Sequence, residues 1–536
     1  MNTSDFKIAR RWNALNRLLQ VVLSVTLVVG LNILAWQSGI RFRRPLPFAH
    51  TQTLALETVK QLESAARRAP PKTGKTETGQ WPWLVIYDIM GAAEASNKDK
   101  ESDTSEMLAG ATRRLLDDFV FAAGKPRADG WLSVVRTDSL RRADIYARLQ
   151  KDYDQISPRT ALVVECKGTG RHKIINIEDL RVLRSDASAD VSTAIFPNAF
   201  RGEDALISAI LGVTDTSLIV YHTIGHREMS PDDNSNSPRA MSAFAERLRR
   251  RNISLRPLDL SKVNEVPTDA NLVLVAAPQA AFAKSETAKL IRHMRRAPRA
   301  RFMVFAEVGA DPNLTELFDE WGILADDALI WDPELTTSRG LTIAKRINSE
   351  HDLTRVIAQP RQTGGGGSLA YLLARPVRRD PGAPKDETLR ITELFTASAD
   401  KVRSWGERDY RQKPFRNDPL RGDLEAPVPL AAVAERRIGR NLGIKAAVDG
   451  RILVLGSGDF ASNACFREVG NEIFLLNAVN WMLDRDDMLN ILPRPLAKFQ
   501  LRATESDLSA VTWRFLLIPF LVLLFGFLIS FWRKHT

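Results

Sequence analysis

Two long apolar stretches without a charged residue, one near each end of the chain, constrain this sequence more than any other feature. Residues 18–36 read LLQVVLSVTLVVGLNILAW, and residues 515–532 read FLLIPFLVLLFGFLISFW. A bilayer core about 30 Å thick requires about 20 apolar residues in a helix, so both stretches are long enough to span it. The sequence therefore predicts one transmembrane helix at each end of the chain.

Charges beside these stretches indicate the topology. Basic residues at positions 7–17 and 533–534 favour a cytoplasmic location for both termini, although arginines at positions 41–44 and 514 flank the opposite ends. A cleaved signal peptide is the alternative for the first stretch, but the apolar run is long for one and no A-x-A site follows it. We therefore expect a protein of the bacterial inner membrane whose large domain is extracytoplasmic.

Composition restricts the partners. The 536 residues are 44% hydrophobic and 26% charged, which allows several domain-sized units between the two stretches. The formal charge of +11 comes from basic residues interspersed with acidic ones, as in ERLRRR at 246–251, a pattern typical of solvated helix faces. Contact with anionic membrane lipid is compatible with this pattern, and nucleic-acid binding is not predicted. Cys166 and Cys465 are the two cysteines, and whether they pair is left open.

The middle of the chain alternates between β-branched-rich runs and amphipathic runs, which predicts an α/β fold. We expect two mostly parallel, Rossmann-like sheets. A hairpin is expected around Thr169 and Gly170, and residues 471–484 have the pattern of an amphipathic helix. The predicted parts are a tail and first anchor (1–44), a linker (45–80), a first α/β domain (81–199), the first part of a second (200–347), a flexible Gly/Pro-rich excursion (348–386), its completing part (387–500), and a second anchor and tail (501–536).

Motifs for chemistry are weak. No G-x-x-x-x-G-K-[ST] sequence for cradling nucleotide phosphates occurs, and GTGRHK at 168–173 lies between two strands, as a turn does. GSGDFASN at 456–463 follows a strand but lacks the third glycine of a dinucleotide site. Cys465 is followed by Phe and Arg, whereas a nucleophile elbow requires small neighbours. We therefore predict no catalytic residue, no metal site and no cofactor.

Two glycine-containing loops supply the candidate contacts for a ligand or partner. Both follow strands, and the carboxyl ends of strands are where α/β sheets bind ligands. The loop YHTIGHRE at 221–228 places two histidines and a glutamate together, which is compatible with ligand contact, with loop stabilisation, or with an incomplete metal site. The candidates are Gly225, His226, Glu228, Gly456, Asp459 and Asn463.

An ordered series of segments across nearly the whole chain resembles the gliding-motility-associated (GldG-like) auxiliary component of bacterial ABC-type transport systems. The order and combination of the segments carry the resemblance. They are TLALET (53–58), ALVVECKG (161–168), RHKIINIEDL (171–180), FRGEDALISAILGVT (200–214), TIGHRE (223–228), PLDL (257–260), VPTDANLVLVAAPQ (266–279), EWGI (320–323), HDLTR (351–355), LARPV (373–377), TASADKVRSW (396–405), GSGDFASN (456–463) and LLNAVNWML (475–483).

The resemblance implies a non-ATPase subunit that works beside an ABC-2 type permease and a separate ABC ATPase. Two departures stand out, because the family usually has a glycine at the position of Arg227 and a DLT-like stretch where this chain has RPLPF at 44–48. The alternatives are a membrane-tethered envelope enzyme, hydrolase or amidotransferase-like, and a structural envelope protein. The enzyme alternative requires His226, Glu228, Asp459 and Asn463 to converge in one pocket.

Overall fold

The computed structural model describes most of the region between the two apolar stretches. The described residues are 12, 16, 54–70, 82–90, 102–124, 129–137, 142–153, 156–157, 159–181, 199–235, 237, 239–296, 300–332, 341–358, 369–383, 386–398, 400, 402–438, 447–486 and 494–495. Within these segments, no helix has both the length and the apolar character needed to cross a membrane. The predicted spans at 18–36 and 515–532 lie outside the described residues.

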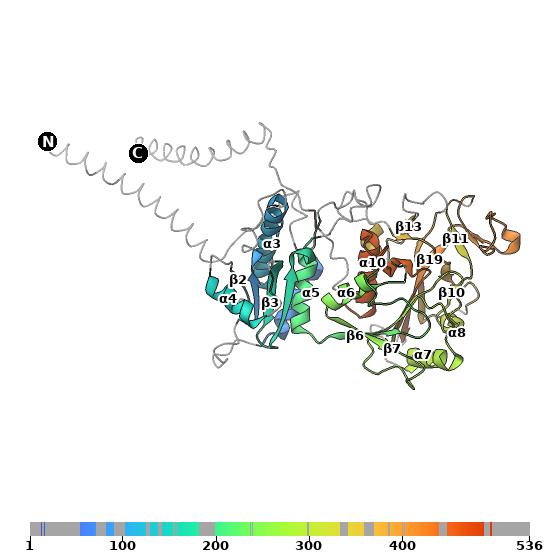
Figure 1. Ribbon diagram of the computed structural model, residues 1–536, viewed down its shortest axis with the longest axis horizontal. Coiled ribbons are helices and arrows are strands. Elements are labelled where there is room, and N and C mark those ends of the chain that lie inside the picture. The colour runs from blue at the N-terminus through green and yellow to red at the C-terminus, as the bar shows by residue number, and fades with distance from the viewer. Residues whose placement is uncertain are drawn as a thin grey trace, which may run out of the picture. The chain divides into compact units, whose positions relative to one another are not determined.

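The first region is a four-stranded sheet with the strand order β2-β1-β3-β4. Its elements are α2 (Leu56–Arg68), β1 (Leu84–Asp88), α3 (Ser102–Ala123), β2 (Leu132–Arg136), α4 (Ala143–Asp152), β3 (Thr160–Cys166), β4 (Arg171–Asn176), η3 (Ile177–Asp179), β5 (Ala199–Phe200) and α5 (Gly202–Thr214). Helices α2, α3 and α5 pack on one face, where Leu84 and Ile86 point, and α4 packs on the other, where Val85 and Tyr87 point (Figure 1).

Strand directions in this sheet correct the prediction of a mostly parallel arrangement. β1 and β2 run parallel, but β3 is antiparallel to both β1 and β4. The reason is connectivity: α3 supplies the crossover that parallel neighbours require, whereas β3 and β4 are joined by a tight turn. Gly170 in that turn has a φ of +66°, so the predicted hairpin is confirmed.

The second region is an eight-stranded mixed sheet with the order β13-β16-β19-β20-β9-β8-β6-β7. Strands β20, β9, β8, β6 and β7 are parallel, and β13, β16 and β19 extend the sheet antiparallel from β20. The strands are β6 (Leu218–Thr223), β7 (Ile253–Leu258), β8 (Leu272–Ala276), β9 (Ala300–Phe305), β13 (Arg346–Ile347), β16 (Leu389–Thr396), β19 (Pro429–Ile438) and β20 (Ala447–Leu455). The second sheet is thus also mixed, with a parallel half.

Helices cover both faces of the parallel half, as such sheets require. α6 (Ser242–Arg250) and α10 (Val469–Met482) pack on one face, and α7 (Lys284–Arg296) and α8 (Thr315–Glu320) on the other (Figure 1). The remaining elements are β10 (Ile323–Ala325), β11 (Leu329–Trp331), β12 (Thr342–Ile343), α9 (Arg355–Ala358), β14 (Ala370–Tyr371), β15 (Val377–Arg379), β17 (Trp405–Glu407), η6 (Pro419–Arg421), β18 (Leu424–Glu425), η8 (Asp459–Ala461) and β21 (Arg494–Pro495).

Packing moves two of the predicted boundaries. α5 was assigned to the second domain, but Leu206, Ile207 and Ile210 lie in the core of the first sheet. The predicted excursion at 348–386 contributes Leu353 and Tyr371 to the core of the second sheet, while its glycine run at 364–368 lies outside the described residues. In both cases the segment belongs to the region whose core buries its apolar side chains, and the local sequence does not specify which core that is.

Helix α10 exists as predicted but is buried rather than amphipathic. Phe474, Leu475 and Val479 belong to the main core, and Asn471 and Asn480 are also buried. The Asn471 amide donates to the carbonyls of Ala370 and Cys465 and accepts the Ala370 N–H, so backbone groups satisfy this buried side chain.

Candidate functional site

Strand order identifies the edge of the second sheet at which ligand contact is expected. The chain passes from β6 to β7 on one side and then to β8 on the other, so the winding direction reverses between β6 and β8. In open α/β sheets, ligands bind outside the carboxyl ends of the strands at such a switch point. Gly225, His226 and Glu228 follow β6, and Ala277 follows β8, so the predicted loop lies at this position.

The loop after β6 has an unusual backbone held by hydrogen bonds. Gly225 has a φ of +112° and Arg227 a φ of +58°, both in the region that glycine favours. The His226 carbonyl accepts the N–H groups of Gln279 (2.9 Å) and Ala280 (3.1 Å) beyond β8, and its own N–H donates to Glu228 Oε2 (2.7 Å). The left-handed backbone explains why glycine suits position 227, where this chain carries arginine.

The His226 side chain packs between two carboxylates and an aromatic ring. Its Nε2 lies 3.0 Å from Glu286 Oε2, and its Nδ1 lies 3.5 Å from Glu228 Oε1. The Phe282 ring centroid is 4.1 Å from that of His226. Because Glu286 also accepts the N–H of Ala283 just before α7, this cluster joins the loop after β6 to the start of α7. Among the described residues, no group of three or more His, Cys, Asp or Glu side chains is arranged to hold a metal ion.

Arg239 connects three strand ends and was missed by sequence reasoning. Its guanidinium donates to the Glu307 carboxylate beyond β9, to the Arg227 carbonyl, and to the Ala277 carbonyl at 2.6 Å. Burial raises the pKa of Glu307, and Arg239 opposes that shift. The signal that identifies Glu307 is its place directly after a buried strand, whereas Arg239 lies in a loop with no such pattern.

Gly456 and Asp459 hold a segment beyond β14 against the end of β20. Gly456 accepts the Arg375 N–H at 2.7 Å, and a Cβ at position 456 would lie 1.9 Å from the Arg375 carbonyl oxygen. Asp459 Oδ2 accepts the N–H groups of Leu372 (3.0 Å) and Leu373 (2.9 Å). Burial raises the pKa of Asp459, and these two N–H groups lower it. The pair therefore positions residues 372–375.

The Arg375 guanidinium, which is buried, donates to four carbonyl oxygens. They belong to Glu307, Ala310, Ala325 and Asp326. Burial lowers the pKa of Arg375. One side chain from the predicted excursion thus satisfies the backbone of the segments that follow β9 and β10.

Asn463 has a separate role at the start of α6. Its Oδ1 accepts the Ala243 N–H (2.9 Å), and its Nδ2 donates to the Ser235 carbonyl (2.7 Å) and to Ser242 Oγ (3.0 Å). The six predicted residues therefore share one edge of the sheet but divide into three sets of partners. The enzyme alternative requires these residues to converge in one pocket, and their contacts do not form such a pocket.

Cys465 is buried against Leu341 and Ala370, Cys166 is buried in β3, and the two do not form a disulfide with each other. The question of pairing, which the sequence left open, is thereby answered.

Exposed apolar side chains lie on the loops at the carboxyl edge of the second sheet. Ile224 is 37% exposed, and Leu372 and Leu373 are 36% and 58% exposed. The edge therefore presents a rigid backbone with apolar groups facing solvent.

Comparisons with known proteins give weak structural similarity. No protein-family model matches the chain, and no curated protein matches it. Among solved structures, an IFT52 N-terminal domain (mmIFT52) is 14% identical, with a TM-score of 0.32, over 49% of this chain and 96% of its own. A putative ThuA-like protein from Bacteroides uniformis is 17% identical, with a TM-score of 0.29, over 52% of this chain and 94% of its own.

The exo-β-1,4-mannosidase Op5Man5 from an Opitutaceae bacterium is 10% identical, with a TM-score of 0.24, over 54% of this chain and 40% of its own. Similarity at this level identifies neither a family nor an activity.

Proposed function

We propose that this chain is a membrane-anchored, non-ATPase auxiliary subunit of an ABC-2 type transport system. In this proposal the two apolar stretches anchor the chain in the bacterial inner membrane, both termini are cytoplasmic, and the α/β region is extracytoplasmic. The carboxyl edge of the parallel strands then contacts a partner of the transport system, such as its permease.

The observation that carries the proposal is that segments of the resemblance, far apart in sequence, meet at this edge. The loop 223–228 contacts the end of 266–279 through the His226 carbonyl, and 373–377 contacts 456–463 through Arg375 and Asp459. A Cβ at Gly458 would lie 2.7 Å from the Ala277 Cβ, so these two pairs of segments also touch each other. A series of short similarities that assembles into one surface supports a shared binding role.

The use of the polar side chains supports binding over chemistry. His226, Asp459 and Asn463 are each engaged with neighbouring loops. Exposed Ile224 and Leu373 supply apolar area beside exposed Arg227, a composition that suits a protein contact. A preordered edge also reduces the entropy lost on binding.

The tethered-enzyme alternative draws on a different observation. Ala277 has a φ of +54° directly after β8, the kind of strained position at which hydrolases with an elbow carry a nucleophile. The partly buried carboxyls of Glu307 and Asp459, whose pKa values are raised by burial, lie nearby. The methyl group of Ala277 supplies no nucleophile, so we rank this alternative second.

The deciding experiment is affinity purification of the full chain from native membranes, at native expression, in two mild detergents. We expect an ABC ATPase and a multi-span permease to co-purify. Ile224→Asp and Leu373→Asp should each reduce their recovery at least severalfold, while Val120→Asp, at an exposed position on α3, should not. Recovery of the chain alone in both detergents would refute a stable complex.

A further inference from the structure

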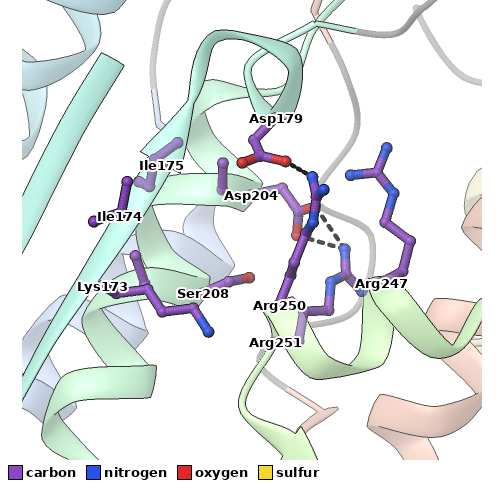
Figure 2. Close-up of a pocket in the computed structure, with 11 residues that line it drawn as sticks. Lys173, Ile174, Ile175, Asp179, Asp204, Ser208, Arg247, Arg250 and Arg251 are labelled. Atoms are coloured by element: carbon purple, nitrogen blue, oxygen red, sulfur yellow. Dashed lines mark hydrogen bonds and ion pairs between the residues drawn. The ribbon is translucent and has the colours of Figure 1, made fainter. Parts of the chain in front are cut away.

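A small cavity lined by charged side chains lies where β4 and α5 of the first sheet meet α6 of the second (Figure 2). Its volume is about 50 Å³, enough for a few water molecules or one compact ionic group. Its lysine ends the GTGRHK segment and its arginines belong to ERLRRR, which the sequence analysis interpreted as a turn and a solvated helix face. The lining residues that matter here are Lys173, Asp179, Asp204, Ser208, Arg247, Arg250 and Arg251.

Among the residues that line this cavity, cationic side chains outnumber carboxylates. Four cationic side chains line it, against two carboxylates. Both carboxylates are already engaged, because Arg251 donates to both oxygens of Asp204 at 2.6 Å and Arg250 pairs with Asp179, as Figure 2 shows. Arg250 also pairs with Glu246, and Arg247 pairs with Glu472, so Lys173 is the lining cation for which no ion pair is found among the described residues.

Arg247 has only a shared partner. Its Nε lies 2.8 Å from Glu472 Oε1, the same oxygen that accepts from Arg201 at 2.6 Å. Burial lowers the pKa of Arg247, and the neighbouring Arg201 lowers it further against the opposing effect of Glu472. One carboxylate therefore serves two guanidinium groups, of which Arg201 is buried and also lies 3.8 Å from Asp204.

Lys173 and Ser208 are the side chains whose polar groups are least satisfied. The Lys173 ammonium donates to the Arg249 carbonyl at 3.4 Å, and none of the ion pairs among the described residues includes it. Burial lowers the pKa of Lys173. Ser208 is 5% exposed, and its Oγ has no hydrogen-bond partner among the described residues. Figure 2 shows this hydroxyl directed toward the arginines of α6.

We propose that this cavity binds a phosphoryl group, either as free phosphate or as the head group of a phosphorylated lipid or other phosphate ester. Lys173 on β4, Ser208 on α5 and Arg247 and Arg250 on α6 approach one small volume from three elements. A tetrahedral oxyanion accepts hydrogen bonds on several sides, whereas a planar carboxylate is matched by a single guanidinium. The anion supplies a counter-charge for Lys173 and the missing hydrogen-bond partner of Ser208.

This proposal goes beyond partner binding at the carboxyl edge, since the cavity uses none of that edge's residues. The donors come from both sheets, so an anion held between them favours the arrangement in which α5 and α6 are adjacent. Binding should therefore raise the unfolding temperature of the chain, and the rise should grow with the logarithm of phosphate concentration once that concentration exceeds the dissociation constant.

The test is isothermal titration calorimetry of inorganic phosphate into the full chain in neutral detergent, without chloride. We expect saturable binding that Lys173→Gln weakens about tenfold, because a charged hydrogen-bond partner is lost. Ser208→Ala should weaken it severalfold. These two positions were chosen because neither belongs to a buried ion pair, so both variants should fold. Lys262→Gln, which removes an exposed lysine paired with Asp259, is the matched control and should bind normally.

A second arm distinguishes the sources of the phosphoryl group. The full chain is placed in phosphatidylcholine nanodiscs with and without phosphatidic acid, and phosphate titrations are repeated. If the phosphatidic acid discs abolish phosphate binding, both for the parent chain and for the Lys262→Gln control, the natural ligand is a lipid head group. If phosphate binding is retained in these discs, the natural ligand is a soluble phosphate ester. Absence of saturable binding in detergent, or equal dissociation constants for the parent chain and Lys173→Gln, overturns the proposal.

Discussion

The two sheets of this chain place their loops differently. In the first sheet β3 runs against β1 and β4, so connections emerge at both edges. In the second, the parallel run β20-β9-β8-β6-β7 sends every strand end to the same edge. The candidate partner surface is built from such ends, whereas the arginine-lined cavity uses the sides of β4, α5 and α6 (Figure 2). Strand direction thus decides whether a surface comes from loops or from element faces.

The largest effect is expected from removing the ion pair that joins the two regions. Glu472 in α10 is buried and pairs with Arg201, just before α5, and with Arg247 in α6. Glu472→Gln removes the charge that both guanidinium groups share, so we expect the free energy of unfolding to fall by about 3–5 kcal/mol. Chemical denaturation of the full chain in detergent measures it.

Glu316→Gln, on the exposed side of α8, serves as the control and should change that free energy by less than about 0.5 kcal/mol. If the two variants lose similar stability, the junction does not depend on this ion pair.

The same carboxylate predicts an acid dependence. Burial acts to raise the pKa of Glu472, but Arg201 and Arg247 outweigh it and lower the pKa from 4.5 to about 2. A lowered native pKa contributes stability above the unfolded pKa and loses it as the pH falls toward the native value. The free energy of unfolding should therefore decline between about pH 5 and pH 2, and Glu472→Gln should decline less. Parallel slopes for the two proteins would contradict this assignment.

A smaller effect is expected at the carboxyl edge. In Gly456→Ala the new methyl group meets the Arg375 carbonyl oxygen, a backbone atom that cannot rotate away. We expect a loss of about 1–3 kcal/mol, the range for overpacking. Gly110→Ala in α3 of the first sheet is the counterpart, because its Cβ meets only the end of the Arg114 side chain. The free energy of unfolding of that variant should rise by about 0.5–1 kcal/mol, since alanine is more favourable than glycine in a helix interior. Equal signs for the two variants would break the contrast.

The smallest predicted change is at the strained end of β8. Ala277 has a φ of +54°, a conformation that is strained for an L-residue with a Cβ but not for glycine. Ala277→Gly should raise the free energy of unfolding by about 0.5 kcal/mol, because the relief of strain exceeds the added entropy of the unfolded chain. Ala276→Gly, at the neighbouring position inside the strand, should lower the free energy of unfolding by about 0.5–1 kcal/mol. Thermal denaturation of both variants checks the difference in sign.

Sequence patterns predicted the parts of the fold that depend on neighbouring residues. The hairpin at Thr169 and Gly170, the strands before the two glycine-containing loops and the helix α10 follow from local periodicity and turn chemistry. Strand direction in the first sheet, the sheet to which α5 belongs and the burial of α10 did not follow. These depend on which apolar surfaces meet across long sequence separations, and one sequence carries no direct record of that.

The candidate site divides in the same way. His226 and Asp459 were found because both follow strands, and the edge of the sheet brings their loops together. Arg239 and Arg375 were missed, since each acts through carbonyl groups supplied by distant segments. The cavity around Lys173 and Ser208 was missed because it joins elements of two sheets. A basic strand residue and a helix serine carry no motif by themselves.

The pairing of β20 with β9 has a consequence for biosynthesis. Gly450–Leu455 completes the parallel half by aligning with Ala300–Phe305, long after those residues have left the ribosome. Contacts of such high sequence separation form late, because closing the long loop costs entropy before any contact repays it. Gly456 and Asp459 arrive with that strand, so the carboxyl edge is complete only in the nearly full-length chain. A partner that recognises the edge therefore selects finished molecules over truncated ones.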